Sequence, residues 1–115
     1  MKVLTSTGDY IESTEVCKYF NSLINRFFKI LPMRENNEKS LQRYMYGLQQ
    51  ELVGCQRFFP ALETCEPFIS LLSNLQYLID TPDCPVSKVK CTVFRSINIC
   101  TRICGHFSDE EVLSE

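Results

Sequence analysis

The chain has 115 residues and a formal net charge of −2, with 44% hydrophobic and 23% charged residues. This length and composition are typical of a single globular domain and exclude a largely disordered chain. The net charge disfavours a dedicated nucleic-acid-binding protein. No apolar run approaches the roughly 18 residues of a membrane-spanning helix, and the N-terminus does not resemble a signal peptide, so we expect a cytoplasmic protein with no membrane association.

Residues 1–12 are interpreted as an N-terminal arm. Two short apolar pairs, Val3-Leu4 and Tyr10-Ile11, flank a polar stretch that contains Gly8 and Asp9. A Gly-Asp turn between apolar pairs favours a small hairpin. A two-stranded hairpin alone is marginally stable in water, so an extended arm is the alternative.

The first amphipathic helix begins after Ser13 or Thr14, either of which is a good N-terminal cap. It should end before Pro32, because the residue that precedes a proline is pushed out of the helical region. Residues 32–37 are then a connector. The side chains expected to face the core repeat at intervals of three and four residues: Val16, Phe20, Leu23, Phe27 and Leu31.

The second helix is capped by Asn36 or Asn37 and ends at Pro60. Gly47 lies in its middle, where a glycine costs about 1 kcal/mol relative to alanine, so this glycine indicates close packing of another helix. The side chains expected to face the core are Leu41, Met45, Leu48, Leu52, Cys55 and Phe59.

The third helix, residues 67–79, carries no charged side chain and is the predicted centre of the core. Pro67 fits its first turn, where a missing N–H group is harmless. A helix with a broad apolar face is stable only when it packs against others. On a helical wheel that face comprises Phe68, Leu71, Leu72, Leu75, Leu78 and Ile79.

The fourth helix is expected to run from Cys84 to Cys104 and to end at Gly105, a residue suited to the left-handed closing position. Residues 106–115 form a short acidic tail that frays. Short links join the four helices, so we predict an all-α fold, a small antiparallel four-helix bundle, with residues 13–105 as its one domain. The inward side chains of the fourth helix are expected to be Val86, Val89, Val93, Ile97, Cys100 and Cys104.

Seven cysteines are many for this length. In a secreted chain they would form disulfides, whereas in a cytosolic chain they are mostly small apolar side chains in helices. Because the N-terminus does not resemble a signal peptide, we expect all seven to be thiols. With a single histidine and no nucleotide or cofactor motif, the sequence predicts no metal site and no cofactor.

The fourth helix carries the most distinctive polar pattern. Lys88, Arg95 and Arg102 are spaced by seven residues and share one stripe, which we call the basic strip. It would suit phosphates or an acidic partner, or it is an ordinary solvated face. Cys91 points away from the core between two of these cations, which favour a thiolate, so Cys91 is the candidate reactive thiol; an idle surface cysteine is the alternative.

Several large apolar side chains fall outside the inward stripes. Tyr46 and Val53 are seven residues apart and adjacent on the outer face of the second helix, and Phe28 is outward on the first. Such a patch marks an interface more often than a substrate site. The alternative is that the N-terminal arm folds over Tyr46 and Val53.

The sequence contains no catalytic motif, so we expect no enzyme. The predicted function is a non-catalytic protein–protein interaction module, which binds a protein partner or itself as a homodimer. The alternative is a small nucleic-acid-associated regulator that uses the basic strip.

Overall fold

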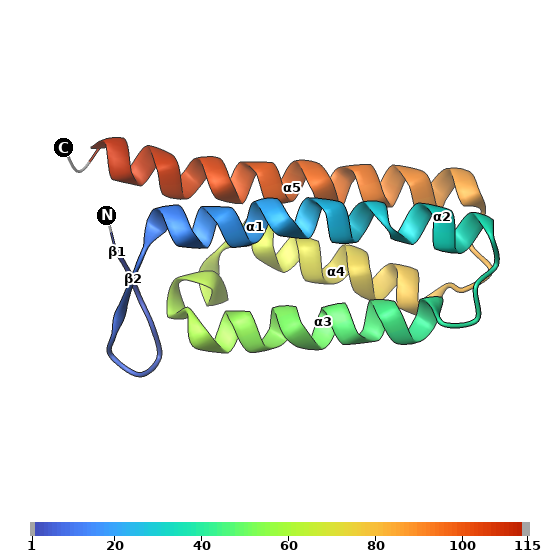
Figure 1. The fold of residues 1–115 in the computed structure, drawn as a ribbon, viewed down its shortest axis with the longest axis horizontal. Coiled ribbons are helices and arrows are strands. Elements are labelled where there is room, and N and C mark those ends of the chain that lie inside the picture. Colours follow the sequence, from blue (N-terminus) through green and yellow to red (C-terminus); the bar gives the residue numbers. More distant parts are fainter. Residues whose placement is uncertain (1, 114–115) are drawn as a thin grey trace.

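The structure is a computed structural model that describes residues 2–113, and beyond Gly105 it describes the side chain of Phe107 alone. Its elements, in chain order, are β1 (Lys2–Leu4), β2 (Tyr10–Glu12), α1 (Ser13–Phe28), α2 (Ile30–Glu35), α3 (Leu41–Phe58), the short 3-10 helix η1 (Pro60–Thr64), α4 (Glu66–Asp80) and α5 (Val86–Leu113). The predicted antiparallel four-helix bundle is confirmed, with α1 and α2 together forming the first of its four helical segments (Figure 1). Between residues 2 and 113, no helix has both the length and the apolar character needed to cross a membrane.

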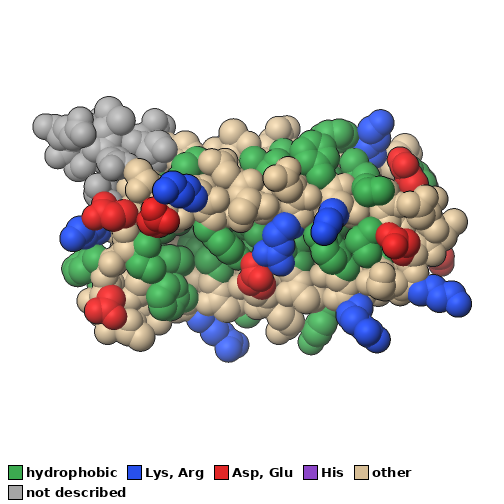
Figure 2. Space-filling model, in the orientation of Figure 1, with side chains coloured by type: hydrophobic (Ala, Val, Ile, Leu, Met, Phe, Trp, Pro, Cys, Tyr) green, Lys and Arg blue, Asp and Glu red, His purple; other side chains and the backbone are tan. Residues whose placement is uncertain are grey.

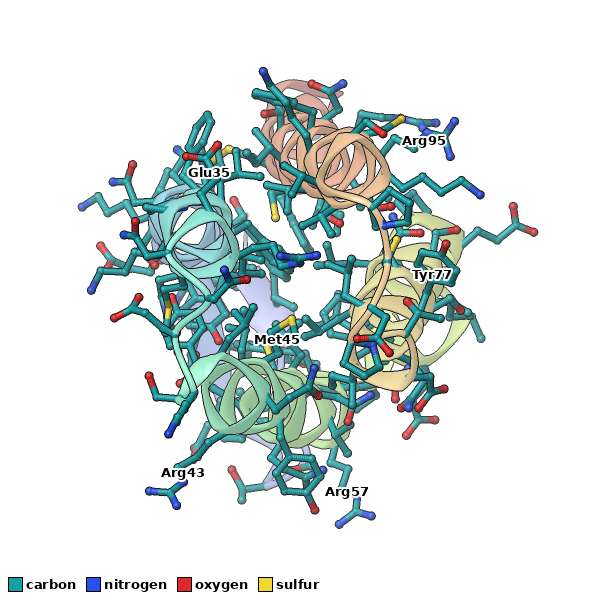
Figure 3. The ribbon with its side chains drawn as sticks, turned by 90° about the vertical axis from the view of Figure 1, so that its right-hand side faces the viewer. Glu35, Arg43, Met45, Arg57, Tyr77 and Arg95 are labelled. Atoms are coloured by element: carbon teal, nitrogen blue, oxygen red, sulfur yellow. A yellow bond between two sulfur atoms is a disulfide. The ribbon has the colours of Figure 1, made fainter. Side chains whose placement is uncertain are left out.

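The four segments surround one apolar core. Seen end-on, α5 lies between α1 and α4, and α3 closes the ring on the opposite side (Figure 3). As predicted, α4 supplies the centre, because Phe68, Leu71, Leu75 and Leu78 are all buried. The ring of Phe68 meets that of Phe20 on α1 edge to face, with 6.0 Å between the ring centroids. The core therefore joins segments that face each other across the bundle as well as neighbours.

Pro32 does not end the first helical segment, contrary to the prediction. α1 stops at Phe28, but Lys29 keeps helical backbone angles (φ −59°, ψ −24°), and α2 begins at Ile30. Pro32 therefore lies in the first turn of α2, where its missing N–H group breaks no hydrogen bond of that helix. Ile30 is fully buried and holds α2 against the core. The predicted connector is thus helical as far as Glu35.

The asparagines close α2 and do not cap α3. Asn37 has a positive φ of 51°, a left-handed conformation that asparagine tolerates better than most residues. α3 begins only at Leu41, after a link of residues 36–40. Within α3, a Cβ atom added at Gly47 would meet no heavy atom within 4 Å, so the predicted close packing at this glycine is wrong within the chain.

α5 extends beyond its predicted C-terminal end. It begins at Val86, which is 40% exposed and not inward as predicted, and continues through Gly105 to Leu113. The buried side chains of Ile103 and Phe107 lie on either side of this glycine, four residues apart. The apolar stripe therefore continues past Gly105 and supports further helical turns. Most of the predicted tail is helical, and residues 114–115 lie outside the described residues.

The N-terminal arm forms the predicted hairpin. β1 and β2 pair antiparallel with Val3 opposite Ile11, and Gly8 in the turn has a φ of 89°. Val3 is buried, and the Ser6 N–H group donates to the Phe58 carbonyl at 2.7 Å, so the hairpin is fixed to the C-terminal end of α3. It packs against α1 and η1. The interpretation that it covers Tyr46 is wrong, because that side chain is 56% exposed.

A polar bridge that the sequence did not predict joins α1 to α3. Glu51 of α3 accepts hydrogen bonds from the Tyr19 hydroxyl, at 2.6 Å, and from the Arg26 guanidinium, both on α1. The Tyr44 hydroxyl of α3 donates to the Arg26 carbonyl at 2.7 Å. The hydrogen bonds from Arg26 and Tyr19 hold the pKa of Glu51 below its ordinary value. Glu51 therefore stays charged at pH values where an unpaired glutamate begins to take up a proton.

Leu75→Ala should lower the free energy of unfolding by about 2–5 kcal/mol, because it truncates a fully buried leucine at the centre of α4. Urea unfolding measures the change. Ile69→Ala is the matched control on the same helix, since Ile69 is 43% exposed, and it should cost less than about 1 kcal/mol. Equal effects at the two positions would mean that α4 does not form the centre of the core.

Glu51→Gln should lower the free energy of unfolding at pH 7 by about 0.2–1 kcal/mol, the range for exposed ion pairs. The folded protein lowers the pKa of Glu51, so this contribution is complete above the unfolded value of about 4.3 and is lost as the pH falls through the lowered pKa. The two proteins should therefore be equally stable near pH 2, measured by urea unfolding. A difference that persists in acid would show that the charge of Glu51 is not the cause.

Candidate functional site

The first candidate site is the outer face of α3. At intervals of three and four residues it carries a row of side chains that we call the α3 stripe: Arg43, Tyr46, Gln50, Val53 and Arg57. Tyr46 is exposed, and Val53 is half-buried without belonging to the apolar cluster of the core. The stripe therefore presents apolar surface that the bundle itself does not use.

Two arginines mark the ends of the α3 stripe. Arg43 and Arg57 both point away from the bundle in the end-on view (Figure 3). Within the described residues neither takes part in an ion pair. Their fourteen-residue separation corresponds to about 21 Å along a helix. The stripe is thus an apolar centre between two cations, with no acidic side chain among its members.

Two glycines lie beside the α3 stripe. Gly47 and Gly54 are seven residues apart and both exposed. A Cβ atom added at either position would meet no heavy atom within 4 Å, so the fold does not require glycine there. The helix backbone is bare at these two positions, while Glu51, which lies between them on the same side, is bonded to α1.

Phe28 does not lie with Tyr46 and Val53. Its ring packs edge to face on that of Phe94 in α5, with 5.8 Å between the ring centroids. Both rings are 40% exposed, so this pair forms a separate apolar feature where α1 meets α5. The sequence did not reveal the pairing, because Phe94 is far from Phe28 along the chain.

The second candidate site is a pocket of about 460 Å³ between α4 and α5, which we call the α4–α5 pocket. Its lining residues are Asn74 and Tyr77 from α4, with Lys88, Cys91, Thr92 and Arg95 from α5. Figure 3 shows Tyr77 and Arg95 on the same side of the bundle. Two cations of the basic strip and the predicted exposed thiol therefore share one pocket. Arg102 is exposed on the same helix but does not line it.

Hydrogen bonds fix the walls of the α4–α5 pocket. The Asn74 amide of α4 donates to the Ser96 hydroxyl of α5 at 3.4 Å, and Ser96 in turn donates to the Thr92 carbonyl at 2.9 Å. The Tyr77 hydroxyl lies 3.6 Å from the sulfur of Cys84, and this hydrogen bond raises the pKa of Tyr77. Both walls are thus tied to the folded core.

A second hollow, of about 260 Å³, lies where the hairpin, α1 and the end of α3 meet. Figure 2 shows apolar side chains along the furrow between α1 and α3 on this face. The hollow is lined by Ile11, Glu15, Val16, Tyr19 and Phe59. It is almost wholly apolar, and nothing in its lining selects an occupant, so we assign it no role.

The cysteines are not all thiols, contrary to the prediction. Cys17 of α1 and Cys104 of α5 form a disulfide, with 4.6 Å between their Cα atoms. The pairing was hidden in the sequence because 87 residues separate the two cysteines. The free cysteines are Cys55, Cys65, Cys84, Cys91 and Cys100.

The free cysteines differ in access to solvent. Burial raises the pKa of Cys55 to about 11 and that of Cys100 to about 12. Cys84 is buried and Cys65 is half-buried, whereas Cys91 is exposed. The candidate thiol of the α4–α5 pocket is therefore the one that solvent reaches best. Among the side chains that the structure describes, which end at Gly105 apart from Phe107, no three histidine, cysteine or acidic groups gather closely enough to hold a metal ion.

Cys104→Ser should lower the free energy of unfolding by about 2–4 kcal/mol, because the Cys17–Cys104 disulfide closes a long loop and restricts the unfolded chain. Cys91→Ser removes an exposed free thiol instead and should change it by less than about 0.5 kcal/mol. Urea unfolding without reductant measures both. Alkylation of the denatured, unreduced protein should label five cysteines; labelling of all seven would show that the disulfide is absent.

The chain matches no family model, no curated protein and no solved structure. Its function is therefore inferred from the α3 stripe and the α4–α5 pocket.

Proposed function

We propose that this chain is a non-catalytic protein–protein interaction module whose α3 stripe binds an acidic helix of a partner protein. One observation carries the proposal. Tyr46, 56% exposed, stands with Val53 between two arginines that have no ion-pair partner among the described residues. Tyrosine and arginine are the side chains that most often anchor protein interfaces. The stripe offers no carboxylate, histidine or thiol for chemistry, which supports a binding role.

Charge favours a different protein over a second copy of this chain. If two copies paired through the α3 stripe, Arg43 of one would face Arg57 of the other in an antiparallel arrangement, or Arg43 in a parallel one. Like charges placed opposite each other destabilise a contact. Carboxylates on a partner would instead pair with both arginines, each through two parallel hydrogen bonds. The homodimer is therefore the less favoured form of the proposal.

The two exposed glycines support a helix as the occupant. A glycine within a helix costs about 1 kcal/mol relative to alanine, and the fold gains no close contact from Gly47 or Gly54. Bare backbone lets a second helix approach closely. Their seven-residue spacing repeats that of Tyr46 and Val53, so a helix along the stripe would meet both pairs together.

Nucleic-acid binding through the basic strip is the alternative function. Lys88, Arg95 and Arg102 are all exposed. Three phosphate contacts give only a weak affinity that falls steeply with salt, and the net charge of −2 works against it. The alternative therefore stays secondary.

Location in the cytoplasm stays a prediction. The free cysteines are consistent with it, because reducing systems keep cytosolic thiols reduced. The Cys17–Cys104 disulfide argues against it for the same reason. Alkylation of thiols in intact cells, before lysis, would show whether Cys17 and Cys104 are joined in the compartment where the protein resides.

Two synthetic helical peptides test the proposal on the full chain. One is a 21-residue amphipathic helix with leucine and alanine on one face and glutamates fourteen residues apart; its twin carries lysines at those two positions. The acidic peptide should bind about tenfold tighter, measured by fluorescence anisotropy, because attraction to both arginines replaces repulsion. Replacing both arginines, Arg43→Glu with Arg57→Glu, should reverse the preference.

The matched control reverses the same number of positive charges on another helix. Lys88→Glu with Arg95→Glu makes the same change in net charge on α5 and should leave the peptide preference unchanged. Equal binding of the two peptides, or binding of neither, contradicts the acidic helix. A dimer in light scattering that Tyr46→Lys with Val53→Lys converts to a folded monomer would make a second copy the partner.

A further inference from the structure

The α4–α5 pocket arranges two cations around a thiol. Lys88 lies three residues before Cys91 and Arg95 four residues after it, so all three share one side of α5. All three line the pocket with Asn74 and Tyr77. The two cations are about 10 Å apart along the helix axis, with the sulfur between them.

Nothing in the pocket neutralises these cations. Its lining contains no acidic side chain. Neither Lys88 nor Arg95 joins an ion pair with any described residue. The volume, about 460 Å³, lies within the range of small-molecule sites. The amide of Asn74 and the hydroxyls of Tyr77 and Thr92 add polar groups that can orient a ligand.

We propose that the α4–α5 pocket binds small disulfides that carry anionic groups on both sides of the sulfur–sulfur bond, and that Cys91 forms a mixed disulfide with them. The two anionic groups pair with Lys88 and Arg95, which places the ligand sulfur over the thiol midway between them. Cationic disulfides are repelled by the same two side chains. The selectivity thus comes from the cation pair, and the attachment from the thiol. This site is separate from the α3 stripe.

The covalent step is a thiol–disulfide exchange. The Cys91 thiol loses its proton, and the thiolate attacks one sulfur of the bound disulfide. A new bond forms between Cys91 and that sulfur as the disulfide bond of the ligand breaks. The other half of the ligand leaves as a thiolate and takes up a proton. The ligand disulfide is the oxidant, and one of its halves is released reduced.

The other free cysteines do not offer this geometry. Cys84 and Cys100 are buried, and Cys55 and Cys65 are half-buried. None of these four lines the pocket. A mixed disulfide should therefore form first at Cys91.

Three disulfide reagents of different charge test the proposal on the native full chain. Oxidised glutathione carries carboxylates on both sides of its sulfur–sulfur bond, hydroxyethyl disulfide is neutral, and cystamine is cationic. Intact-mass spectrometry follows the rate of adduct formation, and peptide mapping locates it. The glutathione adduct should form at Cys91, be absent in Cys91→Ser, and form more slowly at high salt, because salt screens exposed charges.

The decisive quantity is the rate with oxidised glutathione divided by the rate with hydroxyethyl disulfide. In Lys88→Gln with Arg95→Gln this ratio should fall about tenfold, while the ratio for cystamine rises, because two attractive charges are removed. The neutral reagent reports whether the thiol is still accessible in the variant. Arg43→Gln with Arg57→Gln is the matched control, with the same loss of charge on α3, and should leave both ratios unchanged.

A glutathione ratio that is the same with and without Lys88 and Arg95 would overturn the proposal and leave Cys91 an idle surface thiol. First modification at another cysteine would overturn it as well. Either result leaves the α3 stripe untouched, because the peptide experiment depends on Arg43 and Arg57 alone.

Discussion

The bundle depends on the burial of one face of α4. Phe68, Leu71 and Leu75 are fully buried, and no charged side chain interrupts this helix between Pro67 and Ile79. Such a face is stable only when it is covered, and α1, α3 and α5 each turn an apolar stripe toward it. Because these three helices give their apolar faces to the core, their outer faces and the seams along the bundle, including those beside α4, are what remains for binding. Both proposed sites lie there: one on the back of α3, one on the seam between α4 and α5.

The spacing of apolar residues predicted which side chains are buried better than local signals predicted where the helices end. Apolar residues at intervals of three and four placed Phe20, Leu48 and Leu75 in the core correctly. Local signals failed where burial elsewhere outweighed them. Met33, which packs against the core, carries the helix past Pro32, and buried Phe107 carries it past Gly105. A proline or glycine that predicts a helix end says nothing about the tertiary contacts that the next helical turn makes.

The candidate sites were likewise predictable only in part, namely where one helix carries all the residues concerned. Seven-residue spacing on one helix was enough to group Tyr46 with Val53, and Lys88 with Arg95 around Cys91. Features formed by residues of two helices could not be predicted from the sequence, because core packing decides which residues of neighbouring helices lie side by side. The contribution of Asn74 and Tyr77 to the pocket is one such feature, and the Cys17–Cys104 disulfide is another.

The disulfide also determines how the molecule would respond to force. The hairpin and the C-terminal end of α5 lie at the same end of the bundle (Figure 1), and Cys17 is joined covalently to Cys104 across 87 residues of sequence. Tension applied to the two termini would pass directly through the sulfur–sulfur bond. Once the hydrogen bond from Ser6 to Phe58 and the packing of the hairpin on η1 have broken, the segment between the two cysteines, which includes α3, α4 and the candidate sites, would carry no load. Further stretching would then be confined to the hairpin, the first turn of α1 and the last turns of α5, so Val3 and Phe107 would leave the core while the part of the core between the two cysteines stays folded.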